Sequence, residues 1–322
     1  MPDVFFIELS REIEGASHYE LEVLSETGHF SITRSGERFA VVSGETDSLT
    51  KTAFVNRISL ILKSGPDPSV VSDVKLGEGR FHVRFMDNDE CHDALIEPEI
   101  GNALDGKGRI DFKNPDFIIR VYHWGEWYIC REIYQKSQKE LQSRRAPLRP
   151  FFSPVSIHPK FARFFVNISG TRPGDTILDP FCGTGGILIE AGLMGRNVTG
   201  NDWSLQMATG AKLNLKYFGL RGFNIYNEDF INMNFTEKFH AIITDMPYGK
   251  NAPLSQKDLS DLYSRSFKKF HSLLHEGGRC VVVLSDINYL NDITSMFDIR
   301  KIIRYRVHKS LTRYFAVLQK IG

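Results

Sequence analysis

The chain is poor in cysteine and has no long apolar run. Its 322 residues hold four cysteines, and none of them forms a C-x-x-C pair or a ligand cluster with a nearby histidine. Scattered cysteines of this kind favour a reducing compartment and argue against structural zinc. No apolar run approaches the roughly 18 residues of a membrane span, and the start Met-Pro-Asp lacks a basic and apolar signal. We therefore expect a cytoplasmic protein without a membrane or a metal among its partners.

Net charge is also nearly absent, but the charges are unevenly distributed. The formal net charge is +1. Residues 1–50 hold ten acids and three Lys or Arg, residues 131–149 hold six basic residues and two acids, and residues 299–322 hold seven Lys or Arg and no acid. A polyanion would meet the two basic segments and avoid the acidic one. Ordinary solvated faces would produce the same composition.

Two nucleotide-binding signatures are missing from the glycine loop Asp179-Pro-Phe-Cys-Gly-Thr-Gly-Gly186. It contains no G-x-G-x-x-G, which argues against NAD, and no G-K-S/T, which argues against a nucleoside triphosphate. Its glycines allow a sharp turn from a strand into a helix whose N-terminus faces a ligand. An acid at the start of this turn suits a ligand with a cationic amine, and S-adenosylmethionine carries an amino-acid tail and a sulfonium. The predicted cofactor residues of the loop are Asp179, Cys182 (as a small packing residue), Gly183, Thr184 and Gly185.

Two more acids end the next predicted strands. Asp202 lies 23 residues after Asp179, the spacing at which a doubly wound sheet places a carboxylate on ribose hydroxyls. Asp229 could accept a hydrogen bond from an adenine amino group, with Phe230 beside the ring. Trp203 is predicted to lie half in the core and half against the cofactor. Either acid alone could instead be the N-cap of the next helix, but the ordered series favours a ligand site.

A second motif, Thr244-Asp-Met-Pro-Tyr-Gly249, also ends a buried run. The exocyclic amino group of a base is a poor nucleophile, so hydrogen-bond acceptors must aim it at the methyl group. The Asp245 carboxylate and the Met246 main-chain carbonyl can accept its two N–H groups, and Pro247 fixes the turn. The ring of Tyr248 offers a stacking face worth about 1–3 kcal/mol per base. Because the sulfonium already activates the methyl group, positioning carries most of the rate.

A proline-rich segment divides the chain. Residues 147–159 carry four prolines, which predicts a stiff linker and a domain boundary. After it strands alternate with helices, which predicts a mostly parallel, seven-stranded sheet that ends in an antiparallel hairpin, the fold of Rossmann-like class I methyltransferases. The predicted strands are 176–179, 197–202, 224–229, 241–245, 279–284, 297–307 and 313–318. The predicted helices are 159–168, 184–194, 203–218 and 257–275, the last one stopped by Gly277 and Gly278.

The part before the linker is predicted to be α+β, without a catalytic cluster. Residues 110–121 and 124–128 predict a hairpin. The other predicted strands are 4–9, 29–34, 38–42, 80–86 and 117–122, and the predicted helices are 17–25, 47–62 and 88–103.

Several segments resemble archaeal tRNA guanosine N2-methyltransferases. They are the glycine loop with Ile187-Leu-Ile-Glu-Ala191, the clamp motif at 244–249, Arg149-Pro-Phe-Phe-Ser-Pro-Val-Ser-Ile-His-Pro-Lys-Phe-Ala-Arg163 and Val307-His-Lys-Ser-Leu-Thr-Arg313. The stretch Asp111-Phe-Lys-Asn-Pro-Asp116 resembles the end of a THUMP domain, an RNA-binding module. Asp-Met-Pro-Tyr differs from the family's Asp-Pro-Pro-Tyr only at Met246, which leaves the main-chain acceptor in place and makes the turn less rigid.

The resemblance implies a layout and an activity. The layout is a ferredoxin-like segment at 1–50, a THUMP domain at 51–146, a linker at 147–159 and an S-adenosylmethionine-dependent methyltransferase domain at 160–322. The activity is methylation of the guanosine at position 10 of tRNA, once or twice.

Basic residues near the linker and in the C-terminal hairpin are predicted to hold tRNA phosphates while the target guanosine leaves its stack, at a cost of a few kcal/mol. Any one of these side chains could instead be an ordinary solvated charge. The predicted RNA-binding residues are Lys136, Lys139, Arg144, Arg145, Arg149, Arg304, Arg306, Lys309 and Arg313.

Several alternatives remain open from the sequence. The same clamp could serve N2-guanosine or N6-adenosine methylation of another tRNA position, ribosomal RNA or DNA, or methylation of a small molecule or a protein glutamine. A non-catalytic RNA-binding subunit would keep the fold. The sequence decides neither the number of methyl groups added, nor the oligomeric state, nor the need for a partner protein.

Overall fold

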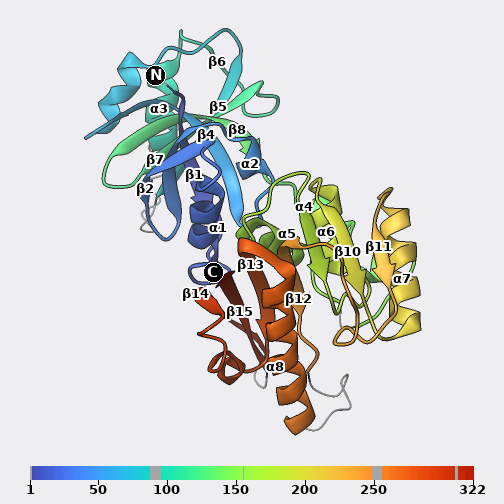
Figure 1. Ribbon diagram of the computed structural model, residues 1–322. Coiled ribbons are helices and arrows are strands. Elements are labelled where there is room, and N and C mark those ends of the chain that lie inside the picture. Colours follow the sequence, from blue (N-terminus) through green and yellow to red (C-terminus); the bar gives the residue numbers. More distant parts are fainter. Residues whose placement is uncertain (1, 88–95, 155, 249–255, 309–310) are drawn as a thin grey trace. The chain divides into compact units, whose positions relative to one another are not determined.

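The computed structural model describes residues 2–87, 96–154, 156–248, 256–308 and 311–322 (Figure 1). The chain forms two compact units. Unit 1 comprises Met1–Glu12 and Thr27–Lys136, and unit 2 comprises Ile13–Glu26 and Ser137–Gly322. The chain therefore passes between the units three times. Within the described residues no helix is both long and apolar enough to cross a membrane.

Unit 1 is built on one eight-stranded sheet of order β2-β3-β1-β4-β8-β7-β5-β6. Most neighbours are antiparallel, while β5 runs parallel to β6 and β7. Its elements are β1 (Val4–Leu9), β2 (Phe30–Ser35), β3 (Phe39–Gly44), α2 (Asp47–Thr50), β4 (Val55–Gly65), η1 (Pro68–Asp73), β5 (Arg80–Asp87), α3 (Ile96–Leu104), β6 (Arg109–Ile110), β7 (Phe117–His123) and β8 (Trp127–Gln135).

The predicted strands of unit 1 are confirmed, and so is the hairpin of β7 and β8. The helix predicted over 47–62 is wrong. Only α2 is helical there, and β4 follows as a central strand hydrogen-bonded to β1 and β8. The apolar spacing of the segment is that of a helix, but its β-branched residues, such as Val55 and Ile58, favour a strand. Hydrogen bonding to a strand on each edge stabilises the strand further. The helix predicted over 88–103 is present from Ile96, and residues 88–95 lie outside the described part.

Unit 2 contains a seven-stranded sheet of order β11-β10-β9-β12-β13-β15-β14. The first five strands are parallel, and β15 runs antiparallel to β13 and β14. The predicted sheet and its terminal hairpin are thus confirmed. The elements are α1 (Ala16–Ser25), α4 (Gln138–Gln142), η2 (Ala146–Leu148), α5 (Pro159–Ile168), β9 (Thr176–Asp179), α6 (Gly186–Leu193), β10 (Asn197–Asn201), α7 (Leu205–Tyr217), β11 (Asn224–Tyr226), β12 (Phe239–Asp245), α8 (Gln256–Leu273), β13 (Leu274–Leu284), η4 (Ile287–Leu290), β14 (Phe297–His308) and β15 (Leu311–Lys320).

Gly277 and Gly278 do not stop α8 as predicted. The helix ends at Leu273, and both glycines lie inside β13, where the pairing with β12 shifts register. Gly277 has a φ of +70°, a left-handed conformation that glycine adopts without strain.

The sheet of unit 2 is buried on both faces. On one face, Ile242 and Val282 join Phe267 of α8 in a common core. On the other, the ring of Phe315 on β15 meets Phe165 of α5 edge to face at 4.8 Å. Burial on both faces explains why the central strands read as continuous apolar runs rather than as alternating ones.

Helix α1 belongs to unit 2 although it comes from the first fifty residues. It packs against α5, where Asn167 Nδ2 donates to Glu20 Oε1 at 2.7 Å. Both side chains are buried. Arg279 Nη2 forms an ion pair with Glu26 Oε2 at 2.5 Å. The predicted helix over 17–25 is confirmed, and these contacts make it part of the second unit.

Candidate active site

Three acids meet at the carboxyl ends of neighbouring parallel strands. Asp179 ends β9, Asp202 directly follows β10, and Asp245 ends β12. Thr244 Oγ1 donates a 2.7 Å hydrogen bond to Asp179 Oδ1. This bond joins the glycine-loop motif to the clamp motif across 65 residues. The crevice at the carboxyl ends of a doubly wound sheet is where such folds bind ligands.

Asp179 is only 1% exposed. Besides Thr244, its Oδ1 accepts the Phe181 N–H at 3.3 Å. Burial raises the pKa of the Asp179 carboxyl to about 8, and the nearby charges of Asp202 and Asp245 act in the same direction. The two hydrogen bonds oppose this shift without cancelling it. A nearby cation would stabilise the ionised form of a carboxyl group in such surroundings.

Asp202 organises the glycine loop. Its Oδ2 accepts the Gly183 N–H and its Oδ1 accepts the Ser204 N–H, both at 2.9 Å. Burial raises the pKa of this carboxyl as well. The N-cap of α7 is Ser204, whose side chain accepts the Met207 N–H. The alternative that Asp202 caps this helix is therefore wrong.

Two asparagines that the sequence reasoning missed fix the loops around the site. The buried Asn201 accepts the Cys182 N–H with its carbonyl at 2.8 Å, and its side chain donates to the Pro180 and Glu228 carbonyls. Asn214 Nδ2 donates to the Thr184 carbonyl at 3.0 Å. For Asn201 the available signal was its place directly before Asp202 at the end of a predicted strand; nothing in the sequence marked Asn214.

The loop has the backbone that its glycines were predicted to allow. Gly183 and Gly185 have φ angles of +52° and +79°. Burial raises the pKa of the Cys182 thiol well above its usual value, so the thiol stays neutral, as expected of a packing residue. Thr184 is buried and shares a 2.8 Å hydrogen bond between hydroxyl groups with Ser156.

The residues predicted around an adenine ring differ in their exposure. Asp229 is exposed, and its carboxylate accepts the Ile231 N–H and the Asn232 side-chain amide. Phe230 is 2% exposed and lies in the core of unit 2. Trp203 is 75% exposed, so the expectation that it lies half in the core is wrong.

The clamp motif leaves one acceptor unused within the described residues. Asp245 Oδ1 is buried and has no hydrogen-bond partner there. Burial raises the pKa of this carboxyl to about 7, and the Arg313 guanidinium opposes the rise. Arg313 Nη1 lies 3.9 Å from Asp245 Oδ2, and its guanidinium carbon lies 5.4 Å from the centre of the Tyr248 ring. Burial raises the pKa of Tyr248 to about 12, so its hydroxyl stays protonated.

The backbone of the clamp is anchored from two sides. The Met246 N–H donates to the Val283 carbonyl at 3.1 Å, and the Met246 side chain is fully buried in the core. The Pro247 carbonyl accepts the Tyr263 hydroxyl at 2.8 Å. A methionine in place of the family's first proline therefore adds a hydrogen bond to β13 that proline could not donate.

The predicted RNA-binding residues divide by exposure. Arg144 and Arg149 are buried rather than on the surface, because Arg144 pairs with Glu190 at 2.6 Å and Arg149 Nε donates to the Arg144 carbonyl. Lys136 donates to the main-chain carbonyls of Thr52 and Ala53 in unit 1. Arg313 lies in the clamp. Lys139, Arg145, Arg304 and Arg306 are exposed, and Lys309 lies outside the described residues.

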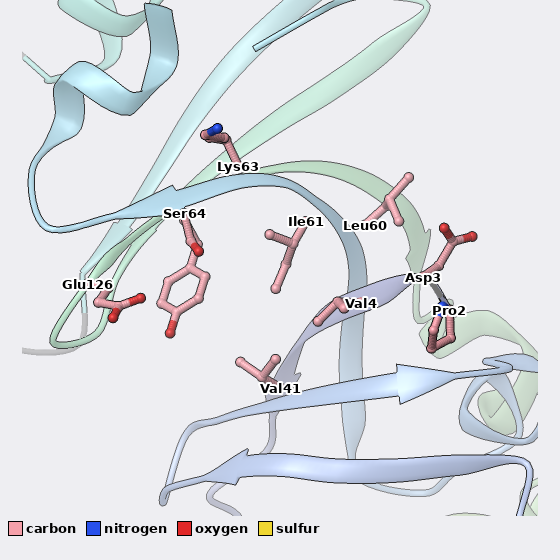
Figure 2. A pocket seen from close by; sticks show the side chains of 10 residues that line it. Pro2, Asp3, Val4, Val41, Leu60, Ile61, Lys63, Ser64 and Glu126 are labelled. Atoms are coloured by element: carbon pink, nitrogen blue, oxygen red, sulfur yellow. The ribbon is translucent and has the colours of Figure 1, made fainter. Parts of the chain in front are cut away.

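A separate hollow of about 590 Å³ lies in unit 1 and contains none of the predicted site residues. Figure 2 shows Ile61, Lys63 and Ser64 of β4 lining it together with Val4 of β1 and Val41 of β3. It lacks the clustered acids and the glycine loop of unit 2. Within the described residues no group of three His, Cys, Asp or Glu side chains is placed to hold a metal ion.

The sheet order, the glycine loop after β9 and the buried acids at the strand ends define a Rossmann-like class I methyltransferase. The solved structure of TrmN from Thermus thermophilus shares this fold with a TM-score of 0.59 and 20% identity, over 99% of this chain and 100% of that one. Residues 147–314 match the family model described as RMKL-like, methyltransferase domain.

Two relatives of known name identify the family of the chain. A tRNA (guanine(10)-N2)-dimethyltransferase from Methanothermobacter thermautotrophicus is 39% identical over 316 residues, which are 93% of this chain and 94% of that protein. A protein of the same name from Pyrococcus abyssi is 33% identical, over 98% of this chain and 99% of its own length. The chain belongs to the family of archaeal tRNA (guanine(10)-N2)-dimethyltransferases.

Proposed function

We propose that the protein transfers methyl groups from S-adenosylmethionine to the exocyclic N2 of a guanosine in tRNA, at position 10 and twice in succession. The names of its relatives support the substrate, the position and the number of methyl groups. The observation that carries the proposal is the buried Oδ1 of Asp245 beside Tyr248, which has no hydrogen-bond partner among the residues that the structure describes. A carboxylate oxygen in that state needs an N–H donor, and an amino group that enters the clamp supplies one.

The three buried acids fit the cofactor. Burial raises the pKa of Asp179, Asp202 and Asp245, and the charges of Asp202 and Asp245 raise that of Asp179 further. A ligand with an ammonium and a sulfonium group offsets this repulsion. When bound, S-adenosylmethionine supplies an electrophilic methyl group on a positively charged sulfur. The loop residues 179–185 and Asp202 would hold it.

The clamp aims the target nitrogen. The guanine amino group donates one N–H to Asp245 Oδ1 and the other to the Met246 carbonyl, while the base stacks on Tyr248. The bond from N2 to the methyl carbon forms as the bond from carbon to sulfur breaks, which leaves N2 with an extra proton. The Asp245 carboxylate can accept this proton because its pKa of about 7 lies near the operating pH.

The exposed arginines and lysines are the proposed phosphate contacts on unit 2. Lys139 lies in α4, Arg145 follows it, and Arg304 and Arg306 lie on β14. Binding through such charges should weaken as salt rises. We propose that the protein acts in the cytoplasm, where unmodified tRNA is available to it.

The test is methylation of an unmodified tRNA transcript by the purified protein, followed by nucleoside analysis. We expect N2-methylguanosine first and N2,N2-dimethylguanosine later, both mapped to position 10. A transcript with adenosine at position 10 is the matched control and should stay unlabelled. N6-methyladenosine as the product, or label at other guanosines only, would contradict the proposal.

Replacing the clamp acid tests the mechanism. We expect Asp245→Ala to lower the single-turnover rate at least a hundredfold, because the amino group is no longer oriented. Binding of S-adenosylmethionine and of tRNA should remain close to that of the parent protein. Asp261→Ala, which removes an exposed acid on α8, is the control and should keep full activity. Retained transfer by Asp245→Ala would remove Asp245 from the reaction.

A further inference from the structure

Two unsatisfied polar atoms lie in the clamp. Asp245 Oδ1 and Arg313 Nε are both buried without a hydrogen-bond partner in the described part of the chain. Arg313 Nη1 lies 3.9 Å from Asp245 Oδ2. That distance is too long for a direct hydrogen bond, yet the charges interact strongly because the side chains are only 18% and 20% exposed.

The same guanidinium contacts the second clamp residue. Its carbon lies 5.4 Å from the centre of the Tyr248 ring, within the range of a cation–π contact. Arg313 is held there by the sheet, because β15 pairs with β13 on one edge and β14 on the other, with Arg313 opposite Tyr305. Arg306 on the adjacent strand is exposed, so not every arginine of the hairpin reaches the clamp.

We propose, building on the proposed function, that Arg313 is a positioning residue of the clamp rather than a phosphate contact. It keeps the Asp245 carboxylate ionised and fixes the ring of Tyr248 until the target base enters. Arg313 thereby acts on the reaction through the two residues that meet the base.

Burial disfavours the negative charge of Asp245. Asp179 on β9 and the hydroxyls of Tyr248 and of Tyr263 on α8 also lie close enough to interact with this carboxylate, and burial raises the pKa of all three groups, which favours their neutral forms. Arg313 is the cation that opposes the effect of burial. Loss of this cation therefore raises the pKa of Asp245. Because the ionised form of Asp245 accepts the amino group, the rate of methyl transfer rises with pH through that pKa. Loss of the Arg313 cation moves this rise to higher pH.

The test is the single-turnover rate as a function of pH for the parent protein, Arg313→Gln, Arg313→Lys and the control Arg306→Gln. The parent protein should reach half of its maximal rate near pH 7. Arg313→Gln should reach half of its maximal rate about one pH unit higher than the parent protein. Its rate should therefore be roughly tenfold lower than that of the parent below pH 7 and recover at higher pH. Arg313→Lys keeps the charge and should keep the parent pH dependence at a lower maximal rate. Arg306→Gln removes a proposed phosphate contact, so it should raise the KM for tRNA and leave the pH dependence of the single-turnover rate unchanged.

Other outcomes would overturn the proposal. An equal loss at every pH would mean that Arg313 is only structural. A higher KM for tRNA and a weaker salt dependence, with an unmoved pH profile, would make it a phosphate contact. A parent protein inactive at every pH would contradict the proposed function instead. In that case the protonation of Asp245 can still be followed by measuring, at each pH, how much the free energy of unfolding differs between the parent protein and Asp245→Asn. If the proposal holds, this difference must change at a higher pH when both proteins also carry Arg313→Gln.

Discussion

The acids of the site show how much a single residue reveals by its place in the sequence. Asp179, Asp202 and Asp245 each follow a recognisable apolar strand, so pattern and spacing were enough to find them. Thr244 and Arg313 were not recognised as parts of the site, because their roles depend on contacts across 65 and 68 residues. Burial was invisible as well, which is why the buried Arg144 and Arg149 were counted among the RNA-binding charges.

Asp179 makes the ligand-free protein less stable as pH rises. Its folded pKa of about 8 lies above the usual value of a carboxyl group, so the folded state binds the extra proton. The stabilisation is complete below about pH 4 and is lost as pH rises towards 8. We expect Asp179→Asn to raise the Tm by several degrees at pH 8 and to flatten the dependence on pH, while it weakens cofactor binding. Thermal unfolding across this range, with the exposed Asp261→Asn as control, checks it. An Asp179→Asn protein less stable at pH 8 would show that the carboxyl is not buried as described.

Met246 should tolerate a change of shape better than loss of its N–H. Met246→Leu keeps the volume and the hydrogen bond to Val283, and should cost less than about 1.5 kcal/mol. Met246→Ala opens a cavity and should cost about 2–5 kcal/mol. Met246→Pro restores the motif of the family but removes the donor, so we expect a larger loss than with leucine. Urea unfolding of the three variants orders them, and a proline variant as stable as the leucine variant would contradict the importance of this hydrogen bond.

Among the elements, the strands of both sheets were easier to predict than their order or partners. Short apolar runs bounded by turns identify strands wherever one or both faces are buried. The exception, β4, shows the limit. The apolar spacing in its sequence predicts a helix, and the segment forms a strand because it pairs with β1 on one side and β8 on the other. Likewise, the pattern of α1 predicted a helix without showing that α5 is its partner.

The hydrogen bond between Glu20 and Asn167 should anchor α1 to α5. Glu20→Ala leaves the buried amide of Asn167 without this acceptor, so we expect a loss of about 1–3 kcal/mol in the free energy of unfolding of unit 2. Glu22→Ala, on the exposed face of the same helix, should stay within about 0.5 kcal/mol of the parent. Urea unfolding followed by a probe in unit 2 makes the comparison. Equal effects of the two variants would mean that α1 contributes through helix content alone.

For the molecule as a whole, the proline-rich segment at 147–159 is the obvious boundary in the sequence, and the longer segment of unit 2 begins close to it at Ser137. A linear sequence cannot show that a distant helix completes a domain, because such packing leaves no mark in local composition. The catalytic unit is discontinuous, and Ile13–Glu26 is part of it.

Residues 137–322 should therefore be unstable alone. We expect this fragment to bind a hydrophobic dye and to unfold at a lower temperature than unit 2 of the full chain. A synthetic peptide of residues 13–26 should raise its Tm in proportion to the logarithm of peptide concentration. The same peptide with Glu20→Ala should do so more weakly. A fragment as stable alone as with the peptide would show that α1 is dispensable.

The placement of α1 also sets an order of events during protein synthesis. Glu20 leaves the ribosome 147 residues before Asn167, the residue it binds. At about 5–20 residues per second, that interval lasts roughly 7–30 s. During this time unit 1, whose two segments precede and follow the helix in the sequence, can fold while the binding face of the helix stays open to solvent and to chaperones. The first helix to be made thus cannot dock until α5 has left the ribosome, and the sheet of unit 2 is complete only once β15 has been made.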